Sequence, residues 1–412
     1  MDQSYTPQVS LVACGDYEPQ TVYAAVKHSI DLLGGIEAFV KPGARVLLKP
    51  NLVRSMAPER AATTHPAVVA AVARLVVEAG GRPLIADSPG GPYTTGTLKA
   101  TYRRTGMEAA AEASGASLNY DTGGTQVANP GAKVLHRLDL IDPLLQVDAI
   151  INLPKLKTHN LTVLTMSVKN LFGLVPGSLK IGYHSKLVDR ELFCEGLLDL
   201  MLFVQPVLTV MDAVVGMEGE GPTGGEPRQI GAIVSGRDPL AIDTLGAELV
   251  GVDPLTVTTT RLAVARGLTT GNLQGITVVG DTLESLQVHD FHQGLDAPLD
   301  PGLIPGPLRF LVRLATPPTV NDQPDTRSAR AFRSLAQGWI WKQLVARPRA
   351  TERCIACGFC VKHCPVNAIE IVNGRARMDG SVCIRCYCCH ELCPHDAIEL
   401  YKPFLGRLVS SK

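Results

Sequence analysis

The chain has 412 residues, a hydrophobic fraction of 45% and a formal net charge of zero, so it is long enough for two or three domains. Disordered chains carry a high net charge and few apolar residues, and nucleic-acid-binding proteins carry an excess of basic residues, so this composition argues against both classes. The first residues show no basic stretch followed by an apolar run, and no segment reaches 18 consecutive apolar residues. We therefore expect no signal peptide, no transmembrane helix and no membrane or nucleic-acid partner.

Short apolar runs alternate with helical patterns through the first 290 residues. The runs that we expect to form strands are Val9–Cys14, Arg45–Leu52, Arg82–Ser88, Asp148–Leu153, Leu208–Val215, Gln229–Ser235 and Ile276–Gly280. The clearest helical patterns between them are Gln20–Leu33, His65–Ala79 and Pro239–Val250. Strands that are apolar along their whole length are typical of a sheet that is covered on both faces. We predict an α/β fold, with a mainly parallel sheet and helices on both faces.

Proline and glycine become frequent from about Pro298, where basic side chains also begin to outnumber acidic ones. Amphipathic helices are expected in this region at Leu308–Leu314 and Ser328–Val345. The region is either a solvated linker or a docking strip for an acidic electron donor. The expected segments are an α/β substrate-binding domain at 1–295, a basic linker at 296–348, a small ferredoxin-like α+β domain at 349–403 and a tail at 404–412.

Nine of the eleven cysteines lie in the last 60 residues, and eight of them form two runs with the spacing C-x2-C-x2-C-x3-C-P. This spacing is that of bacterial ferredoxins with two 4Fe–4S clusters, in which the fourth cysteine of each run binds the cluster of the other run. The expected ligands of one cluster are Cys354, Cys357, Cys360 and Cys393. The expected ligands of the other cluster are Cys383, Cys386, Cys389 and Cys364.

Structural zinc is the alternative for these cysteines, but zinc sites usually use paired CxxC knuckles that lie well apart in sequence. Cys388 is left over beside Cys389, and we expect it to pack near a cluster, with ligation as the alternative. Cys14 and Cys194 are expected to be small buried hydrophobic residues. Because clusters rather than disulfides account for the cysteines, we expect a reducing, cytoplasmic location.

Polar side chains gather at the carboxyl ends of four predicted strands, the edge at which open α/β sheets bind their ligands. Any one of them could be a helix cap or a turn residue, whereas four groups at one edge favour a pocket. The candidates are Lys49 and Asn51, then Asp87 and Ser88, then Lys155, Lys157, Thr158 and His159, and finally Asp212 and Glu218.

Residues 155–186 hold five lysines and two histidines but no aspartate, glutamate or arginine. The lysines are Lys155, Lys157, Lys169, Lys180 and Lys186, and the histidines are His159 and His184. This pattern predicts a cradle for a phosphate or carboxylate group, and the alternative is an exposed basic face. Apolar neighbours place Lys169 and Asn170 on a half-buried helix.

The segment Gly219–Gly224 matches G-x-G-x-x-G, the pattern of dinucleotide-binding loops. A dinucleotide site requires a helix directly after these glycines, and the prolines of this segment prevent one. We therefore expect a mobile flap or rim here, and no NAD or FAD site.

Several of these motifs together resemble the DUF362 family, a domain of unknown function that is often joined to a ferredoxin module. The motifs are Lys49-Pro50-Asn51-Leu52, Asp87-Ser88-Pro89-Gly90, Pro154 to His159 with Thr165, Lys169 to Gly173, and Asp212 with Met217 to Pro222. The resemblance covers about residues 10–290, and the second cysteine run, with Cys388, is similar to such fusions. It implies the two-part architecture, whereas the family supplies no established reaction.

These features favour an iron–sulfur reductase. A soluble low-potential donor such as ferredoxin would supply electrons through the two clusters to a small anionic metabolite, whose C=C or C=N bond is reduced. Lys155, Lys157 and Lys169 would bind the anionic groups of the metabolite and offset the charge that builds up during reduction. His159 is the expected proton donor, with His184 second, because the unperturbed pKa of histidine lies near neutrality. Asp212 and the other carboxylates would orient lysines, bind substrate hydroxyls or relay protons.

Two other functions are compatible with the same residues. The protein could be an electron carrier or an assembly factor whose α/β domain only binds a partner or a ligand. It could also be a non-redox enzyme in which the clusters are structural. A flavin or deazaflavin could bind as well, although no motif in the sequence indicates either cofactor.

Overall fold

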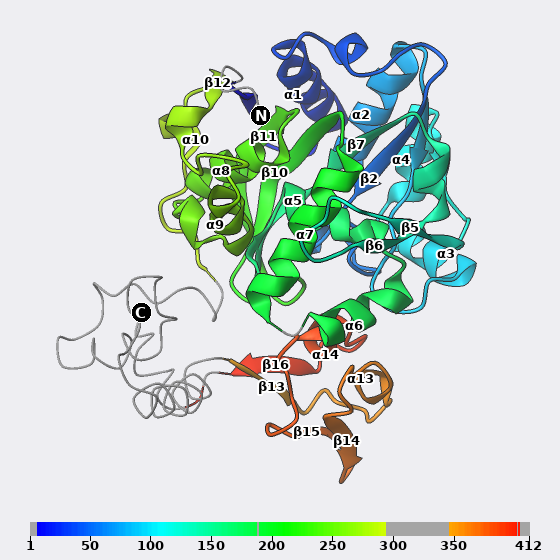
Figure 1. Cartoon of the computed structure of the whole chain (residues 1–412). Helices are drawn as coiled ribbons and strands as arrows, with labels where there is room; N and C mark the ends of the chain where they lie inside the picture. The colour runs from blue at the N-terminus through cyan, green and yellow to red at the C-terminus, as the bar shows by residue number, and fades with distance from the viewer. Residues whose placement is uncertain (1–5, 188, 294–345, 402, 404–412) are drawn as a thin grey trace, which may run out of the picture. The chain divides into compact units, whose positions relative to one another are not determined.

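The computed structural model describes residues 6–187, 189–293, 346–401 and 403 (Figure 1). The chain divides into two compact units, one formed by residues 1–294 together with His363–Val366 and one by the remaining C-terminal residues. Most of the expected linker at 296–348, its two expected helices and the tail at 404–412 lie outside the described residues.

The first unit is built on a ten-stranded sheet whose main path has the order β12-β1-β11-β10-β7-β2-β3-β4. The strands of this path are β1 (Gln8–Ala13), β2 (Arg45–Pro50), β3 (Arg82–Ile85), β4 (Ser117–Leu118), β7 (Ala149–Leu153), β10 (Leu208–Glu218), β11 (Glu226–Gly236) and β12 (Thr277–Gly280). Only β11 runs antiparallel to its neighbours on this path. The seven predicted strands and the mainly parallel sheet are therefore confirmed.

Helices cover both faces of the sheet, as predicted (Figure 1). The α-helices of this unit are α1 (Pro19–Asp31), α2 (Pro66–Glu78), α3 (Thr95–Arg104), α4 (Met107–Ser114), α5 (Ser167–Asn170), α6 (Gly177–Lys186), α7 (Arg190–Val204), α8 (Pro239–Leu249), α9 (Thr258–Ala265) and α10 (Leu283–Leu286). Strand β1 shows the two layers, because successive side chains of a strand point to opposite faces. Ser10 is hydrogen-bonded to Ser29 of α1 at 2.6 Å, whereas Val9 and Leu11 belong to the apolar cluster that includes Ile242 of α8.

The lysine-rich segment after β7 forms a strand of its own, β8 (Lys155–His159), which the sequence reading treated as the end of a strand. Pro154 has no N–H group to donate and separates β7 from β8. Strand β10 is 11 residues long and pairs first with β7 and then with β8. Strand β9 (Val163–Thr165) pairs antiparallel with β8. All five residues of β8 are buried, so their polar side chains must find partners inside the protein.

A short antiparallel pair and six 3-10 helices complete the unit. The pair consists of β5 (Gly124–Ala128) and β6 (Arg137–Ile141), which the sequence reading missed because most residues of β5 are exposed and follow no apolar pattern. The 3-10 helices are η1 (Ile36–Ala38), η2 (Pro58–Arg60), η3 (Asp142–Gln146), η4 (Leu171–Leu174), η5 (Pro254–Thr256) and η6 (Leu273–Gly275). No helix within the described ranges is long and apolar enough to cross a membrane.

Within residues 346–401, the C-terminal unit contains two short antiparallel pairs and two one-turn helices. The pairs are β13 (Arg347–Ala350) with β16 (Ile398–Tyr401) and β14 (Ile369–Val372) with β15 (Arg375–Met378). The helices are α13 (Phe359–Lys362) and α14 (Cys388–Glu391). Each helix follows the second cysteine of its run, so both runs have the same local fold.

The backbone repeats more closely than the sequence does. The residue two places after the first cysteine of each run has a positive φ, at Ala356 and Arg385, and so does the residue four places after it, at Gly358 and Tyr387. The residue three places after the fourth cysteine follows the same rule, at Asn367 and Asp396. Because residues other than glycine rarely adopt this conformation, its recurrence at three matched positions indicates two loops built to the same plan. The internal repeat expected from the cysteine spacing is confirmed.

Candidate active site and iron–sulfur centre

A buried ion pair joins the ends of β2 and β3. Lys49 Nζ lies 2.6 Å from Asp87 Oδ1, and both side chains are at most 3% exposed. Asp87 also accepts hydrogen bonds from the backbone N–H groups of Leu52 and Ser88, at 2.6 and 2.9 Å. Burial lowers the pKa of Lys49, and the charge of Asp87 opposes that effect. The structure thus brings Lys49 and Asp87, two of the predicted site residues, together.

A second buried pair lies where β8 runs beside β10. Lys155 Nζ lies 2.8 Å from Asp212 Oδ2, and both side chains are at most 1% exposed. The Tyr17 hydroxyl donates to Asp212 Oδ1 at 2.7 Å and accepts from Lys155 Nζ at 2.7 Å. The His65 ring stacks on the Tyr17 ring with centroids 3.6 Å apart, and the His65 backbone N–H donates to Asp212. The sequence reading missed Tyr17 and His65, because each is a single polar residue in a loop and belongs to no motif.

The next lysine of β8 is held by neutral oxygens. Lys157 Nζ donates to the Asn51 side chain at 3.2 Å and to the carbonyls of Ala62 and Pro222. The loop after β10 is tied to the same strand, since Gly221 N–H donates to Thr158 Oγ1 at 3.2 Å. A Cβ on Gly221 would collide with the Thr158 carbonyl, which explains the glycine. The G-x-G-x-x-G loop is thus a rim that covers β8.

Three other predicted site residues, Asn170, Ser88 and Glu218, each make different contacts. The Asn170 amide donates to the Lys49 carbonyl at 3.1 Å, which links α5 to the Lys49–Asp87 pair. Ser88 Oγ accepts from the first N–H of α6, at Gly177. Glu218 accepts from His292 N–H at 3.0 Å and lies 3.9 Å from Arg228.

Basic residues converge on His159 from four elements. We call this group the cationic cluster: Lys157 of β8, Lys169 of α5, His184 of α6, Arg190 of α7 and His159 itself. His159 and His184 are buried, whereas Lys169 and Arg190 are partly exposed, so the cluster reaches the surface. Lys169 thus lies on the half-buried helix that the sequence predicts.

Two phenylalanine rings form the apolar support of the cluster. Lys169 Nζ lies 4.9 Å from the ring centroid of Phe172 and 5.7 Å from that of Phe193, within the range of cation–π attraction. His184 stacks on Phe193 with centroids 4.6 Å apart, and Lys180 Nζ lies 5.9 Å from Phe172. The two rings therefore stabilise the basic side chains beside them, and basic side chains of this kind are suited to bind an anion.

Asp243 of α8 fixes the helix that carries Lys169. It is 2% exposed, and its two carboxylate oxygens accept the backbone N–H groups of Ser167 at 2.6 Å and Val168 at 3.1 Å. These are the first residues of α5, whose N–H groups have no partner within the helix. Burial raises the pKa of Asp243 to about 7, and the two hydrogen bonds oppose this rise. Sequence reading missed Asp243 because it lies inside an otherwise apolar helix.

The reason for choosing His159 as an acid is wrong. Burial, then the charges of Lys169 and Lys157, hold its pKa well below the usual value, so the ring is neutral near pH 7. Its Nδ1 accepts the backbone N–H of Leu161 at 3.0 Å, which places the ring proton on Nε2. Burial and the same kind of neighbour lower the pKa of His184 to about 3. The two histidines are therefore neutral, and His159 can donate a hydrogen bond through Nε2–H.

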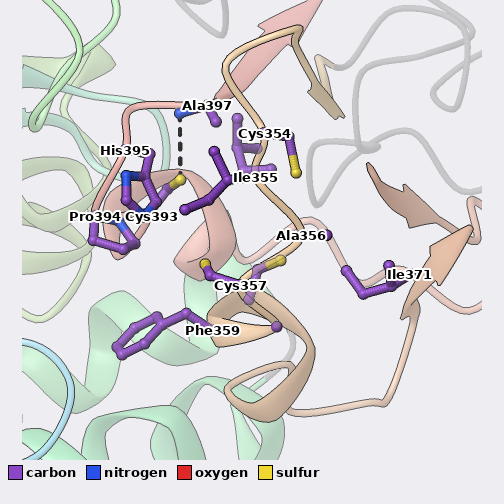
Figure 2. A pocket seen from close by; sticks show the side chains of 13 residues that line it. Cys354, Ile355, Ala356, Cys357, Phe359, Ile371, Cys393, Pro394, His395 and Ala397 are labelled. Atoms are coloured by element: carbon purple, nitrogen blue, oxygen red, sulfur yellow. Dashed lines mark hydrogen bonds between the residues drawn. The ribbon is translucent and has the colours of Figure 1, made fainter. Parts of the chain in front are cut away.

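The C-terminal unit contains a pocket lined by four cysteines from both runs (Figure 2). They are Cys354, Cys357, Cys360 and Cys393, the set expected to hold one cluster. Backbone N–H groups of Ala376 and Ala397 donate to the sulfurs of Cys354 and Cys393, at 3.4 and 3.3 Å. Thiolate ligands of iron–sulfur clusters accept such bonds, so this donor set fits a 4Fe–4S cluster.

Within the described ranges, no group of three or more His, Cys, Asp or Glu side chains lies close enough together to hold a single metal ion. In the second run, Cys388 is buried and its sulfur contacts that of Cys386. Cys388 therefore lies beside an expected ligand, as the sequence predicts. Cys14 and Cys194 are buried, and burial raises the pKa of the Cys14 thiol to about 11 and that of Cys194 to about 12, as expected for inert residues.

We predict that Asp87→Ala lowers the free energy of unfolding by about 3–5 kcal/mol, because it leaves the Lys49 ammonium buried without its counter-ion. The matched control is Asp31→Ala, which breaks the exposed Lys27–Asp31 pair and is expected to cost at most about 1 kcal/mol. Urea denaturation measures both values. Equal losses in the two variants would contradict a buried pair.

We also predict that the free energy of unfolding falls as the pH drops below about 6.5, because the unfolded chain then protonates its histidines while folded His184 stays neutral down to about pH 3. The contribution of His184 to stability is therefore complete above pH 6.5 and is lost progressively below it. His184→Phe keeps an aromatic ring beside Phe193 and should flatten this slope. Urea midpoints between pH 4 and 8 measure it, and an unchanged slope would refute the assignment.

The crossed ligand set predicts how cysteine variants combine. Cys393→Ser and Cys354→Ser should damage the same cluster, so the double variant should lose no more iron than either single variant. Cys393→Ser with Cys383→Ser should damage two clusters and lose about twice as much. Iron and acid-labile sulfide per chain, measured after anaerobic reconstitution, give the answer. Additive losses for the first pair would show that Cys393 does not serve the cluster of the first run.

Comparisons with known proteins agree with this architecture. Residues 46–248 match the domain of unknown function DUF362, and residues 350–370 match a 4Fe–4S binding domain. The thylakoid-associated protein sll1697 of Synechocystis sp. is 37% identical over 252 residues, which cover 61% of this chain and 77% of that protein.

Solved structures give weaker matches. The lactate racemase apoprotein from Thermoanaerobacterium thermosaccharolyticum aligns with a TM-score of 0.36 and 11% identity, over 58% of this chain and 56% of that one. A protein from Thermotoga maritima aligns with a TM-score of 0.32 and 12% identity, over 54% and 56%. This chain thus spans little more than half of either structure. From the domain match and the cyanobacterial relative, the chain belongs to the DUF362 family and carries a 4Fe–4S binding domain at its C-terminal end.

Proposed function

We propose that the protein is an iron–sulfur reductase that acts on a small anionic metabolite bound at the cationic cluster. One observation carries this proposal: a chain with a 4Fe–4S binding domain also gathers Lys157, Lys169 and Arg190 around two neutral histidines. Two of these basic side chains, Lys169 and Arg190, are partly exposed, and basic side chains bind phosphate and carboxylate groups. A cytoplasmic location and a soluble low-potential donor such as ferredoxin are parts of the same proposal.

We propose two clusters. The first would be held by Cys354, Cys357, Cys360 and Cys393, which line one pocket. The second would be held by Cys383, Cys386, Cys389 and Cys364, and the matched backbone of the two loops supports it. When bound, such clusters supply one-electron transfer at low potential.

The residues of the α/β domain would bind and polarise the substrate. Lys169 and Arg190 are the partly exposed cations of the cluster, so we assign them the anionic group. His159 would donate a neutral hydrogen bond through Nε2–H to an oxygen or nitrogen of the substrate. Reduction of a C=C or C=N bond consumes two electrons and two protons. Since both histidines are neutral near pH 7, we assign proton donation to the Lys169 ammonium.

The buried lysines would have a positioning role in the proposed site. Lys49 and Lys155 are paired with aspartates, and Lys157 donates to neutral oxygens of the protein. We propose that they position β8 and the loops above it rather than bind substrate directly. Because these three lysines are bound by groups of the protein itself, they also favour the second candidate function, a carrier or assembly factor whose α/β domain binds a ligand without converting it.

Anaerobic purification followed by mass spectrometry of the small molecules released on denaturation tests the binding part. We expect an anionic metabolite from the wild type and at least about tenfold less of it from Lys169→Gln, which removes a charged contact. Lys186→Gln is the matched control, because Lys186 is an exposed lysine at the end of α6. Equal release from both variants would contradict binding at the cationic cluster.

A second experiment with the released molecule distinguishes the reductase from the carrier. Added to the dithionite-reduced protein, it should re-oxidise the chain, seen as recovery of visible absorbance, with appearance of its reduced form. Binding without re-oxidation would refute the reductase and support the carrier.

A further inference from the structure

The two cysteine loops carry different side chains at one matched position. Five residues after the first cysteine, the first loop has Phe359 and the second has Cys388, and these residues begin the helices α13 and α14. Each follows a residue with positive φ, Gly358 or Tyr387, so the two backbones reach this position in the same conformation. Phe359 lines the pocket of the first loop (Figure 2). The repeat therefore places Cys388 beside the second cluster site.

The Cys388 thiol also contacts a cysteine of the second site directly. Its side chain is hydrogen-bonded to that of Cys386, one of the ligands proposed for the second cluster. Cys388 is 5% exposed, so water does not compete for this bond. The contact between the two side chains and the matched position in the repeat are separate observations, and both place the thiol at the second site.

Charge decides which of the two sulfurs donates. A cysteine binds iron as a thiolate, so a cluster-bound Cys386 has no proton and can only accept. A second thiolate buried beside it would be repelled by the first and would lack the water that stabilises its charge. Cys388 therefore keeps its proton when a cluster is bound and donates its S–H group to the sulfur of Cys386.

We propose that Cys388 raises the reduction potential of the second cluster by donating an S–H hydrogen bond to Cys386. This inference rests on the proposed function for the presence of a second cluster. Reduction adds one negative charge to the cluster and its thiolates, and a hydrogen-bond donor stabilises the reduced state more than the oxidised state. Backbone N–H groups of Ala376 and Ala397 donate to ligand sulfurs of the first site, and Cys388 supplies a side-chain donor to the second.

The test is an anaerobic redox titration of the full-length reconstituted protein, followed by visible absorbance. In Cys388→Ala, half of the absorbance change should move to a lower potential, because one of two clusters loses a donor, and the other half should stay in place. Cys388→Ser keeps a small side chain with an O–H donor and should retain the wild-type curve. The iron content should stay at about eight atoms per chain in the wild type and in both variants.

Two further variants control the titration. Cys194→Ala removes a buried cysteine of α7, in the other unit of the chain, and should leave the curve unchanged. Phe359→Cys is the reciprocal change, because it places a thiol at the matched position of the first loop. It should move the other half of the absorbance change to a higher potential.

The inference is overturned if Cys388→Ala leaves the curve unchanged or if Cys388→Ser shifts it as far as Cys388→Ala does. A loss of about four irons in Cys388→Ala would show that Cys388 is a ligand rather than a donor, and a wild type with only about four irons would remove the second cluster. No substrate is present in this titration, so a failure to find turnover would refute the proposed reaction without touching this result.

Discussion

Two buried lysine–aspartate pairs set the conditions for the rest of the α/β domain. Lys49 with Asp87 joins the carboxyl ends of β2 and β3, and Lys155 with Asp212 joins the start of β8 to β10. A buried charge without a partner is costly, so each pair requires its strands to stay in register and its loops to close over them. Tyr17, Asn170 and the backbone N–H groups around them supply the remaining hydrogen bonds. The edge where a ligand would bind is therefore rigid before any ligand arrives.

The cationic cluster depends on this rigidity. Lys157 is held on β8 by neutral oxygens, and Asp243 fixes the start of the helix that carries Lys169. The positive charges gather on the Phe172 and Phe193 rings, and their nearness, together with burial, keeps His159 neutral. A neutral imidazole with its proton on Nε2 orients and polarises a ligand, whereas it is a poor proton donor. The chemistry of the site thus follows from the placement of charges that lie on four different elements.

The C-terminal unit builds its two cysteine loops with the same backbone conformation. Both cysteine runs need left-handed residues at matched positions, because three cysteines at two-residue gaps must turn inward around one centre. Gly358 meets that need without cost, and Tyr387 meets it at a cost that its buried ring offsets.

Much of this architecture could be predicted from the sequence. Continuous apolar runs predicted seven strands, because a strand buried on both faces has few polar positions, and the helices Gln20–Leu33, His65–Ala79 and Pro239–Val250 were found within a few residues. Strand β8 was not predicted because its polar residues do not show an apolar strand pattern, although all of them are buried. Tyr17, His65 and Asp243 were not predicted as site residues because their hydrogen-bond partners lie far away along the chain. The pKa of His159 could not be read from its residue type, because burial and neighbouring lysines decide it.

The sequence by itself determined the family, the α/β class and the grouping of Cys354, Cys357 and Cys360 with Cys393, since each depends on spacing along the chain. Only the tertiary structure decided which lysines pair with aspartates and which remain around His159. The reason is that burial and electrostatic neighbours are properties of three-dimensional contact, and identical residue types acquire different chemistry from them.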